Sequence, residues 1–410
     1  LLVANEIQRV SKEHGNQAIY GGSYGWASAG RFHHAQSQLH RFLCCAGGYT
    51  DSVDTYSFAA AEVIVPHVLG SFWRYISAQT SWPSIVDNTQ VVLAFGGMPL
   101  KNAQISNGGT ARHVQRSYMQ QAKDKGVEFI NIGPLQDDCA DFLNAKWYGI
   151  RPNTDVAIML GMTHSLVSNN LHDRAFLKKY CVGFERFEDY LMGRSDGQAK
   201  DAAWAAAISG MDADEIVNTA RLISSKRCMI AVSWSLSRQD HGEQAYWMGI
   251  TLAAILGQMG LPGGGIGFGY AADNTMGNHT HHYKMGALPR GENKIKDFIP
   301  VARVSDMLLY PGEFYDYNGK QYVYPDIKLV YWAGGNPFHQ QQDIGKLLKA
   351  WRRPETIIVN EIWWNATARH ADIVLPCTSP LERNDLGGAA NDPALIAMHA
   401  AVRPHGLAKN

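Results

Sequence analysis

The strongest constraint on the fold is an alternation of short apolar runs with helical segments. The apolar runs end in glycine or small polar residues and lie at 91–97, 127–134, 227–235, 327–338, 355–364 and 371–376. Segments with helical spacing lie at 1–15, 31–46, 58–70, 111–125, 154–170, 212–225 and 241–260. Such alternation is typical of α/β domains with parallel sheets, which bind ligands at the carboxyl ends of their strands.

The chain is long enough for two or three domains. It has 410 residues, and a domain averages about 150. We expect a discontinuous α/β domain made of 1–84 and 300–410, and a doubly wound, nucleotide-binding-type domain over 85–275. A polar, His-rich loop, 276–299, would connect them. A crevice between two such domains is the usual place for a large ligand.

Composition excludes several classes of protein. Lys plus Arg and Asp plus Glu are both 37, which argues against nucleic acid as a partner. The longest apolar run on a helical pattern, near 248–256, is far shorter than the ~20 residues of a membrane span. Six scattered cysteines without a Cys-x-x-Cys pattern argue against an iron–sulfur cluster or a zinc ribbon. Because the chain begins at Leu1 inside a helical pattern, we expect it to be a fragment.

Four strand ends carry turn residues of the kind that approach phosphates and sugars: Gly96–Gly97, Gly133–Pro134, Trp234–Ser235 and Gly334–Asn336. Backbone N–H groups at such turns bind anions. Each alone is most often a plain turn, but four of them predict a large ligand. The glycine-rich segment 261–269 follows a helix rather than a strand, so it fails as a dinucleotide motif and is expected to end the helix.

Three further features offer chemistry, each with a plainer alternative. Tyr24 and Trp26 flank a glycine and carry hydrogen-bond donors, although a tryptophan is usually a core residue. Ser57 stands outside any Gly-x-Ser-x-Gly motif, and it could simply cap the helix that follows, which Pro66 would bend or end. The histidines of His279–His282 could bind a metal, but no carboxylate lies at ligand spacing near them.

Long motifs then indicate a family. They are YGGSYGWASAGRFH, DTYSFAAAEVIVPHVLG, TDVAIMLGMTHSLV, HGEQAYWMGITLAAILGQMGLPGGGIGFGY, IPVARV, YWAGGNPF and TARHADIVLP, followed by ERND. In this order they closely resemble the molybdopterin oxidoreductases of the dimethyl sulfoxide, trimethylamine N-oxide and biotin sulfoxide reductase type. The resemblance covers about 15–386. It implies a multidomain α/β fold with doubly wound, mainly parallel sheets around a central cofactor crevice.

The resemblance implies a cofactor and a metal ligand. The family holds molybdenum between two molybdopterin guanine dinucleotides, and in this branch a serine completes the metal shell. The family's Gly-Asp-Tyr-Ser motif aligns with 54–57, so Ser57 becomes the candidate ligand. A serine alkoxide is a hard oxygen donor that suits an oxophilic metal. Tyr24 would hydrogen-bond to the metal oxo group or the substrate oxygen, and Trp26 would close the pocket.

Further residues match cofactor contacts of the family. They are Ile132, Gly133, Asn153, Thr154, Asp155, Trp234, Ser235, Arg238, Asn336, Gln340, Asn360 and Glu361, together with Trp26. There are two departures. Relatives usually have an aspartate where this chain has Gly133, so a ribose-binding carboxylate is missing, and Asp137 or Asp138 could replace it. Relatives read Asp-Pro-Ile-Lys-Thr where this chain has Met98–Asn102.

The implied activity is reductive oxygen-atom transfer, which converts an S-oxide or N-oxide into a sulfide or amine plus water. The alternatives are a molybdenum dehydrogenase or hydroxylase on the same scaffold, and a non-catalytic nucleotide-binding scaffold. The expected partners are a small S-oxide or N-oxide and a cytochrome or quinol-linked electron donor. The resemblance favours the periplasm, with the cytoplasm as the alternative. It also implies a missing N-terminal stretch and a missing C-terminal cap domain.

Overall fold

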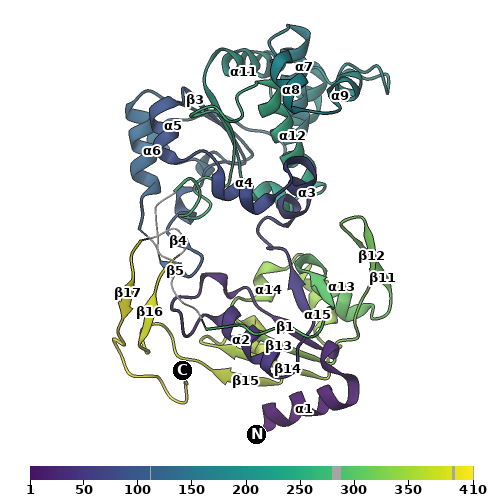
Figure 1. The fold of residues 1–410 in the computed structure, drawn as a ribbon, viewed down its shortest axis with the longest axis vertical. Helices are drawn as coiled ribbons and strands as arrows, with labels where there is room; N and C mark the ends of the chain where they lie inside the picture. Colours follow the sequence, from purple (N-terminus) through teal and green to yellow (C-terminus); the bar gives the residue numbers. More distant parts are fainter. Residues whose placement is uncertain (111, 279–287, 390–392, 410) are drawn as a thin grey trace. The chain divides into compact units, whose positions relative to one another are not determined.

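The computed structural model describes residues 1–110, 112–278, 288–389 and 393–409. The chain divides into two compact units (Figure 1). Unit 1 comprises 1–56, 105–111 and 281–410, and unit 2 comprises 57–104 and 112–280. We expected the first boundary after residue 84. It falls after Tyr56 instead, because Phe58, Ala61, Val65 and Phe72 belong to the hydrophobic core of unit 2.

The sheet of unit 1 has four parallel strands in the order β1-β13-β14-β15. Their bounds are Ile19–Gly22, Leu329–Ala333, Thr356–Glu361 and Ile373–Pro376. Alternate side chains enter two separate cores. Ile19, Leu329 and Ile358 pack with the N-terminal helices, whereas Tyr20, Val330 and Ile357 pack on the opposite face. The sheet is therefore covered on both faces, as buried parallel sheets are.

Helices and strand pairs surround this sheet. The helices are α1 (Leu2–His14), α2 (Ala35–Cys45), α13 (Val304–Leu309), α14 (Pro337–Gln340), α15 (Ile344–Ala350) and α16 (Ala366–Arg369). The strand pairs are β2 (Asp51–Val53) with β10 (Phe298–Pro300), β4 (Ile105–Ser106) with β5 (Gly109–Thr110), β11 (Phe314–Tyr317) with β12 (Lys320–Val323), and β16 (Asp385–Gly387) with β17 (Ile396–Met398).

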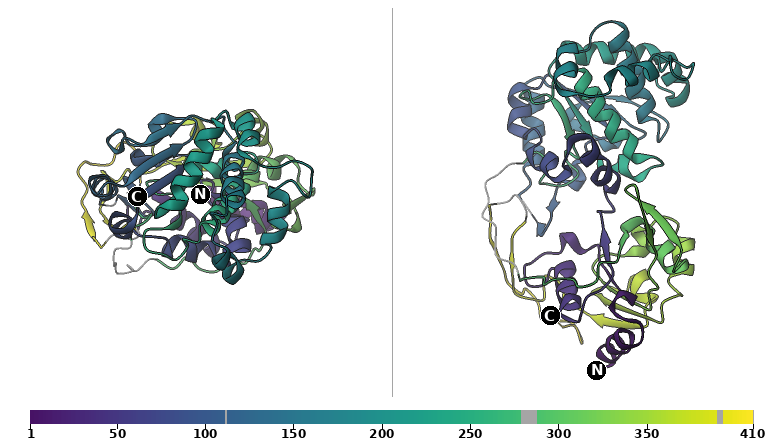
Figure 2. Two further views of the ribbon diagram at one scale, coloured as in Figure 1. Left: turned by 90° about the horizontal axis from the view of Figure 1, so that it is seen from above. Right: turned by 45° about the vertical axis from the view of Figure 1, so that its right-hand side comes forward.

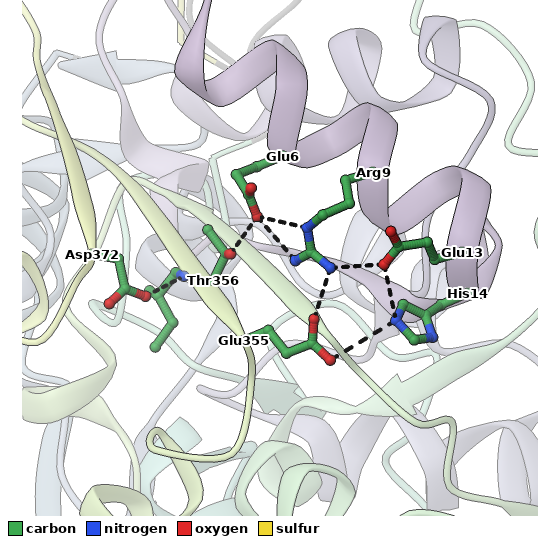
Figure 3. Close-up of polar contacts among 8 residues, drawn as sticks. Glu6, Arg9, Glu13, His14, Glu355, Thr356 and Asp372 are labelled. Atoms are coloured by element: carbon green, nitrogen blue, oxygen red, sulfur yellow. Dashed lines mark hydrogen bonds and ion pairs between the residues drawn. The ribbon is translucent and has the colours of Figure 1, made fainter.

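An ionic network fastens α1 to the start of β14 (Figure 3). Arg9 bonds to Glu6, Glu13 and Glu355, each at 3.0 Å. Glu6 also accepts a 2.8 Å hydrogen bond from the hydroxyl of Thr356. Each of these partly exposed pairs is worth at most about 1 kcal/mol. The network therefore sets where α1 sits more than it stabilises the unit.

The sheet of unit 2 has five parallel strands in the order β7-β6-β3-β8-β9. Their bounds are Lys146–Tyr148, Glu128–Ile132, Val91–Phe95, Cys228–Val232 and Gly265–Phe268. Numbered along the chain, this is the order 3-2-1-4-5 of a doubly wound fold, as predicted. The order reverses between β3 and β8, and ligands of such folds bind at the carboxyl ends of the strands there.

Helices cover both faces of this sheet in the two views of Figure 2. Val91, Leu93 and Phe95 point into one core, and Val92 and Ala94 point into the other. The helices are α3 (Ala59–Leu69), α4 (Phe72–Ala78), α5 (Trp82–Asn88), α6 (Gln115–Asp124), α7 (Asp155–Ser168), α8 (Arg174–Tyr180), α9 (Phe184–Leu191), α10 (Ala202–Ser209), α11 (Ala213–Ser225) and α12 (Gly242–Ile255).

Two local predictions were wrong. The glycine-rich segment after α12 does not only end that helix, because Gly265–Phe268 forms the edge strand β9 beside β8. Pro66 does not end α3, which continues to Leu69. A proline in the last turn removes only one N–H donor from the helix ladder. Among the described residues, no helix is long and apolar enough to cross a membrane.

Candidate active site

The Tyr24 loop lies at the carboxyl edge of the unit 1 sheet. It follows β1, and the backbone N–H of Tyr24 donates to the Gly334 carbonyl at 2.9 Å, at the end of the neighbouring strand β13. Gly335 has a φ of +77°, and a Cβ there would lie 2.5 Å from the Cβ of Tyr24. Only glycine permits this close approach. The turn Gly334–Gly335 therefore lets the Tyr24 loop pack directly against the end of β13.

The backbone of Trp26 is clamped from two directions. Its carbonyl accepts hydrogen bonds from the Gly108 amide at 3.2 Å and from Nε2 of His34 at 2.9 Å. Nδ1 of His34 accepts from the Ser37 amide at the start of α2. His34 is therefore the Nε2–H tautomer. These bonds fix the short turn that presents the Trp26 indole.

Asp385 anchors the rest of the same loop. Its carboxylate accepts from the amides of Arg31, Phe32 and His33 at 3.0, 3.0 and 3.1 Å. Burial alone would raise the pKa of this carboxyl, but the hydrogen bonds outweigh burial and hold the pKa below its ordinary value. Gly30 has a φ of +95°, and a Cβ there would lie 2.0 Å from Asp385. The loop and the carboxylate therefore fit only with glycine at this position.

The hydroxyl of Tyr24 accepts a hydrogen bond from Nε2 of Gln341. The Tyr24 ring packs edge-on against Trp332, with ring centroids 4.9 Å apart. Burial raises the pKa of Tyr24 well above its ordinary value. Tyr24 therefore keeps its proton throughout the ordinary pH range and can act only as a neutral hydrogen-bond donor or acceptor.

Asn336 and Gln340 join the same edge. Oε1 of Gln340 accepts from the Asn336 amide at 3.1 Å, and Oδ1 of Asn336 accepts from the Thr367 hydroxyl at 2.7 Å. The side-chain Nδ2 group of Asn336 takes part in neither of these two bonds, so its N–H donors can serve another partner. The structure brings Tyr24, Trp26, Asn336 and Gln340 to one sheet edge.

Asn360 and Glu361 end the adjacent strand β14 but differ in availability. Oδ1 of Asn360 is buried without a hydrogen-bond partner among the described residues. Glu361, by contrast, is committed to its own turn, because it accepts from the amides of Ile362 and Trp363 and from Nδ2 of Asn365. The Asn360 side chain also bonds to the Cys377 thiol, so Oδ1 of Asn360 is the atom of this pair that is left without a donor among the described residues.

In unit 2, the switch point between β3 and β8 collects a second set of polar groups. The Ser233 amide donates to the Phe95 carbonyl at 3.0 Å, which joins the ends of the two strands. A 3₁₀ turn, Trp234–Arg238, follows β8. Ser235 in this turn is exposed, and its hydroxyl donates to Oγ of Ser233 at 3.1 Å. The predicted residues Trp234, Ser235 and Arg238 therefore stand at this edge.

Asp155 is the most unusual carboxylate of unit 2. It is 3% exposed, and its Oδ1 has no hydrogen-bond partner within the described ranges. Burial raises the pKa of Asp155 to about 6, against the lowering effect of hydrogen bonds from its own amide and from Gln239. Gln239 directly follows the β8 turn, so Asp155 faces the switch point. A buried acceptor without a donor indicates a missing ligand.

The other residues of unit 2 with predicted cofactor roles surround Asp155 or end β6. Asn153 is exposed with a φ of +64°, and the Thr154 hydroxyl donates to the Arg151 carbonyl at 2.6 Å. Ile132 is fully buried at the end of β6, and Gly133 follows it. Asp138 accepts from Lys101 at 3.4 Å, so one of the two proposed substitute carboxylates, Asp137 and Asp138, is already paired.

Ser57 precedes α3, and the packing of the next residue, Phe58, sets its position. Phe58 packs on the Trp234 ring, with centroids 4.6 Å apart, and on Phe268 at 5.5 Å. These contacts hold the start of α3 beside the β8 turn. The N-cap of α3 is Phe58, not Ser57. The simple capping alternative for Ser57 is therefore wrong.

Sequence reasoning found the site edges but missed residues that hold them. His34, Gln341 and Asp385 were not predicted to have roles, although Asp385 closes the quoted ERND motif. No periodicity identifies Gln341 and Asp385, because their partners Tyr24 and His33 lie far away in the sequence. Tyr24 belongs to unit 1 and Ser57 to unit 2. The candidate metal ligands His279, His281 and His282 lie outside the described residues.

Comparison with known proteins agrees with the motifs. The family model described as molybdopterin oxidoreductase matches residues 1–410. A biotin sulfoxide reductase from Cereibacter sphaeroides is 46% identical over all of the chain and 55% of its own length. A dimethyl sulfoxide/trimethylamine N-oxide reductase from the same organism is 44% identical over 98% of the chain and 50% of its length. A trimethylamine-N-oxide reductase from Haemophilus influenzae is 42% identical over all of the chain and 51% of its length.

A solved structure shows a similar fold. Acetylene hydratase from Pelobacter acetylenicus has a TM-score of 0.66 at 19% identity, and the match covers all of this chain and 56% of that one. At this identity the match shows the fold alone. The chain spans about half the length of the reductases it matches.

Proposed function

The chain belongs to the molybdopterin oxidoreductase family, and we propose that it is part of a molybdenum-dependent reductase of S-oxides or N-oxides. One observation carries this proposal most strongly. The similarity to the biotin sulfoxide and trimethylamine N-oxide reductases, at 42–46% identity, extends over the whole chain. Tyr24, Trp26 and Ser57, the three residues to which the motifs assign chemistry, lie within it.

We propose the bis(molybdopterin guanine dinucleotide) form of the cofactor, and the buried polar groups fit it. Guanine presents N–H donors on one edge, and Asp155 offers a buried carboxylate oxygen that has no donor among the described residues. Trp234 offers a donor instead, because its buried indole N–H has no acceptor among the described residues. Asn360 provides a third unpaired atom at the unit 1 edge. Unpaired buried groups of both kinds are expected where a large polar ligand binds.

The metal would supply the two-electron chemistry, and Ser57 would hold it through a hard oxygen ligand. Overall, an S-oxide or N-oxide plus two electrons and two protons gives a sulfide or amine plus water. Ser57 is suited to ligation because it precedes a helix without being its N-cap. Its neighbour Phe58 is locked between Trp234 and Phe268, so the backbone of Ser57 is fixed before a ligand arrives.

Tyr24 would bind and polarise the substrate oxygen. Its raised pKa keeps the phenol protonated, so it donates a neutral hydrogen bond to an oxygen that gains negative charge as its bond to sulfur or nitrogen weakens. Trp26 would close the pocket and exclude water, since the Gly108 and His34 bonds fix its backbone. The substrate is thus oriented by one donor and one apolar wall.

The partners and location of the whole protein stay predictions of the resemblance. We propose a small S-oxide or N-oxide as substrate and a cytochrome or quinol-linked protein as electron donor. The periplasm is the proposed compartment, with the cytoplasm as the alternative.

Dye-linked kinetics on molybdenum-loaded holoenzyme test this function. Reduced viologen should be oxidised when dimethyl sulfoxide, trimethylamine N-oxide or biotin sulfoxide is added, with turnover proportional to bound molybdenum. The reverse assay uses an oxidised dye with a panel of organic donors. Turnover in that direction alone would support a dehydrogenase or hydroxylase and contradict our proposal.

A further inference from the structure

Two consecutive glutamines bond to two tyrosines at the carboxyl edge of the unit 1 sheet, and they do so with opposite polarity. Gln341 donates to the hydroxyl of Tyr24, whereas Gln342 accepts from the hydroxyl of Tyr56. We propose that Gln341 is a positioning residue that forces Tyr24 to act as a hydrogen-bond donor toward the substrate oxygen. The inference rests on the proposed function and assigns a role that the motifs do not contain.

The orientation of the Gln341 amide is fixed by a second partner. Nε2 of Gln341 also donates to the Val301 carbonyl at 3.0 Å. A flipped amide would place Oε1 against that carbonyl oxygen, and two acceptors would then face one another. The Val301 carbonyl therefore decides that nitrogen, not oxygen, faces Tyr24. Because the amide nitrogen is only a donor, the Tyr24 oxygen must accept.

Gln342 provides an internal comparison. Its Nε2 donates to the carbonyl of Ala302, the residue after Val301, at 2.7 Å. The side-chain amide of Gln342 is therefore also oriented by a bond to a backbone carbonyl. Its Oε1 then accepts from Tyr56, and its backbone amide donates to the Tyr56 oxygen at 2.9 Å. The hydroxyl hydrogen of Tyr56 is thus used within the protein. The hydrogen of Tyr24 is not used by Gln341.

The amide of Gln341 is a costly way to fill this position. Gln341 is 5% exposed, and its Oε1 is buried without a hydrogen-bond partner in the described ranges. An unsatisfied buried acceptor destabilises a fold, whereas an apolar side chain of the same length would carry no such penalty. A purely structural role does not explain this choice. A need for two N–H donors, one toward Val301 and one toward Tyr24, does.

The ring of Tyr24 is held as firmly as its oxygen. Trp332 packs edge-on at 4.9 Å with an interplanar angle of 80°, and the Tyr56 ring lies at 5.9 Å. The Tyr24 hydroxyl can then only rotate about its C–O bond. Because its oxygen accepts a hydrogen bond from Gln341, the hydroxyl hydrogen cannot point toward Gln341. The hydroxyl hydrogen points away from Gln341, so it is available to a substrate oxygen without reorganisation.

A double-mutant cycle tests the inference. Gln341→Met keeps the length of the side chain and removes both N–H donors. We expect it to lower kcat/KM for S-oxides about tenfold, mainly through kcat, which corresponds to loss of one oriented hydrogen bond. In the Tyr24→Phe background the same change should have an effect below about twofold. An equal factor in both backgrounds would overturn the proposal, because Gln341 would then act independently of the hydroxyl.

Polarity reversal gives a second test with little change of shape. Gln341→Glu turns the donor into a carboxylate acceptor, which should capture the Tyr24 hydrogen and lower kcat/KM more than Gln341→Met does. Protonation restores a donor, so activity of this variant should recover as pH falls toward the pKa of the new carboxyl. A pH profile parallel to that of the unmodified enzyme would contradict the proposed polarity.

Controls separate this inference from the proposed function and from misfolding. Gln321→Met changes an exposed glutamine on β12 and should leave kcat/KM unchanged. Molybdenum content and thermal unfolding of each variant show whether the holoenzyme has assembled, and rates are compared per bound molybdenum. An unmodified holoenzyme without S-oxide or N-oxide reduction refutes the proposed function. An active enzyme with additive variants refutes only the role of Gln341.

Discussion

Oδ2 of Asp385 lies 2.8 Å from Nδ1 of His33, and this pair joins the Glu-Arg-Asn-Asp segment 382–385 to the loop that carries Trp26. The Asp385 side chain is completely buried. It also accepts from the backbone amides of Arg31, Phe32 and His33. One carboxylate therefore determines the path of the loop that follows Tyr24.

Asp385→Asn should destabilise the protein by about 2–3 kcal/mol, because an amide NH₂ would face backbone donors that a carboxylate now accepts. The lowered pKa of Asp385 fixes the sign of the pH dependence. The stabilisation is complete above the ordinary Asp pKa of about 4 and is lost as pH falls through the lower folded-state value. Denaturant unfolding of both proteins between about pH 3 and about pH 8 measures this pH dependence of the free energy of unfolding. The matched control Asp316→Asn, exposed on β11, should show no such loss.

Asp155→Asn should have the opposite effect on the cofactor-free protein. Burial raises the pKa of Asp155 to about 6, so its ionised form opposes folding above that pH. The difference between this pKa and the ordinary Asp pKa of about 4 predicts a stability gain of about 2–3 kcal/mol for the variant above pH 6, and no gain below about pH 4. Thermal unfolding across this range tests it.

The same Asp155→Asn variant should lose guanine nucleotide, because the unpaired carboxylate oxygen is the proposed acceptor for the base. Nucleotide released on denaturation is quantified per chain. Asp214→Asn serves as the control, since Asp214 is an exposed aspartate in the first turn of α11. Unchanged nucleotide content in Asp155→Asn would assign its buried carboxylate to another ligand.

Tyr24→Phe should lower kcat for S-oxide reduction by about 10- to 100-fold, because it removes the neutral donor to the substrate oxygen. The effect should be the same across the neutral pH range, since the raised pKa keeps the phenol protonated there. Steady-state kinetics with reduced viologen measure it. Unchanged kinetics on all S-oxides and N-oxides would remove Tyr24 from the mechanism.

Ser57→Ala should change the molybdenum coordination seen by X-ray absorption, with one oxygen neighbour fewer or one replaced by water. Protein stability should change little, because Ser57 does not cap α3. A metal–oxygen shell identical to that of the unmodified enzyme would exclude Ser57 as a ligand.

Gly133→Asp should be accepted by the fold. A Cβ at this position would have its nearest contact at 3.6 Å, from Cα of Gly96, and the backbone is not in the left-handed region. We expect a stability change within about 0.5 kcal/mol and tighter retention of guanine nucleotide, because the new carboxylate would lie at the end of β6. Nucleotide loss during dialysis, compared between the two proteins, decides this.

Most strands of the two sheets could be predicted from the sequence, because each of these is a short apolar run followed by glycine or a polar residue. The edge strand β7, Lys146–Tyr148, lies in none of the predicted runs. β3, β6, β8, β13 and β14 all lie within the predicted runs. The edge strand β9 was missed because two of the four residues of Gly265–Phe268 are glycines, which are depleted in strands, and its pairing with β8 makes it a strand. Tertiary context thus overrode local propensity.

The candidate site was predicted in part for the same reason. Tyr24 and Asn336 each follow a strand, and Asn360 lies at the end of β14, so their positions could be inferred from strand ends. Gln341 and Asp385 could not be found in this way. Their roles depend on contacts with Tyr24 and His33, more than 300 residues away along the chain. Pairings of this length leave no local pattern.

Counting the molybdenum and the guanine nucleotide that purified full-length protein releases on denaturation tests most directly whether this chain carries the proposed cofactor. We predict about one molybdenum and two guanine nucleotides per chain, the composition of a bis(molybdopterin guanine dinucleotide) site. If the protein, made in a host that synthesises the cofactor, released neither molybdenum nor guanine nucleotide, the assignment would be contradicted. Asp155, Trp234 and Ser57 would then need a different ligand.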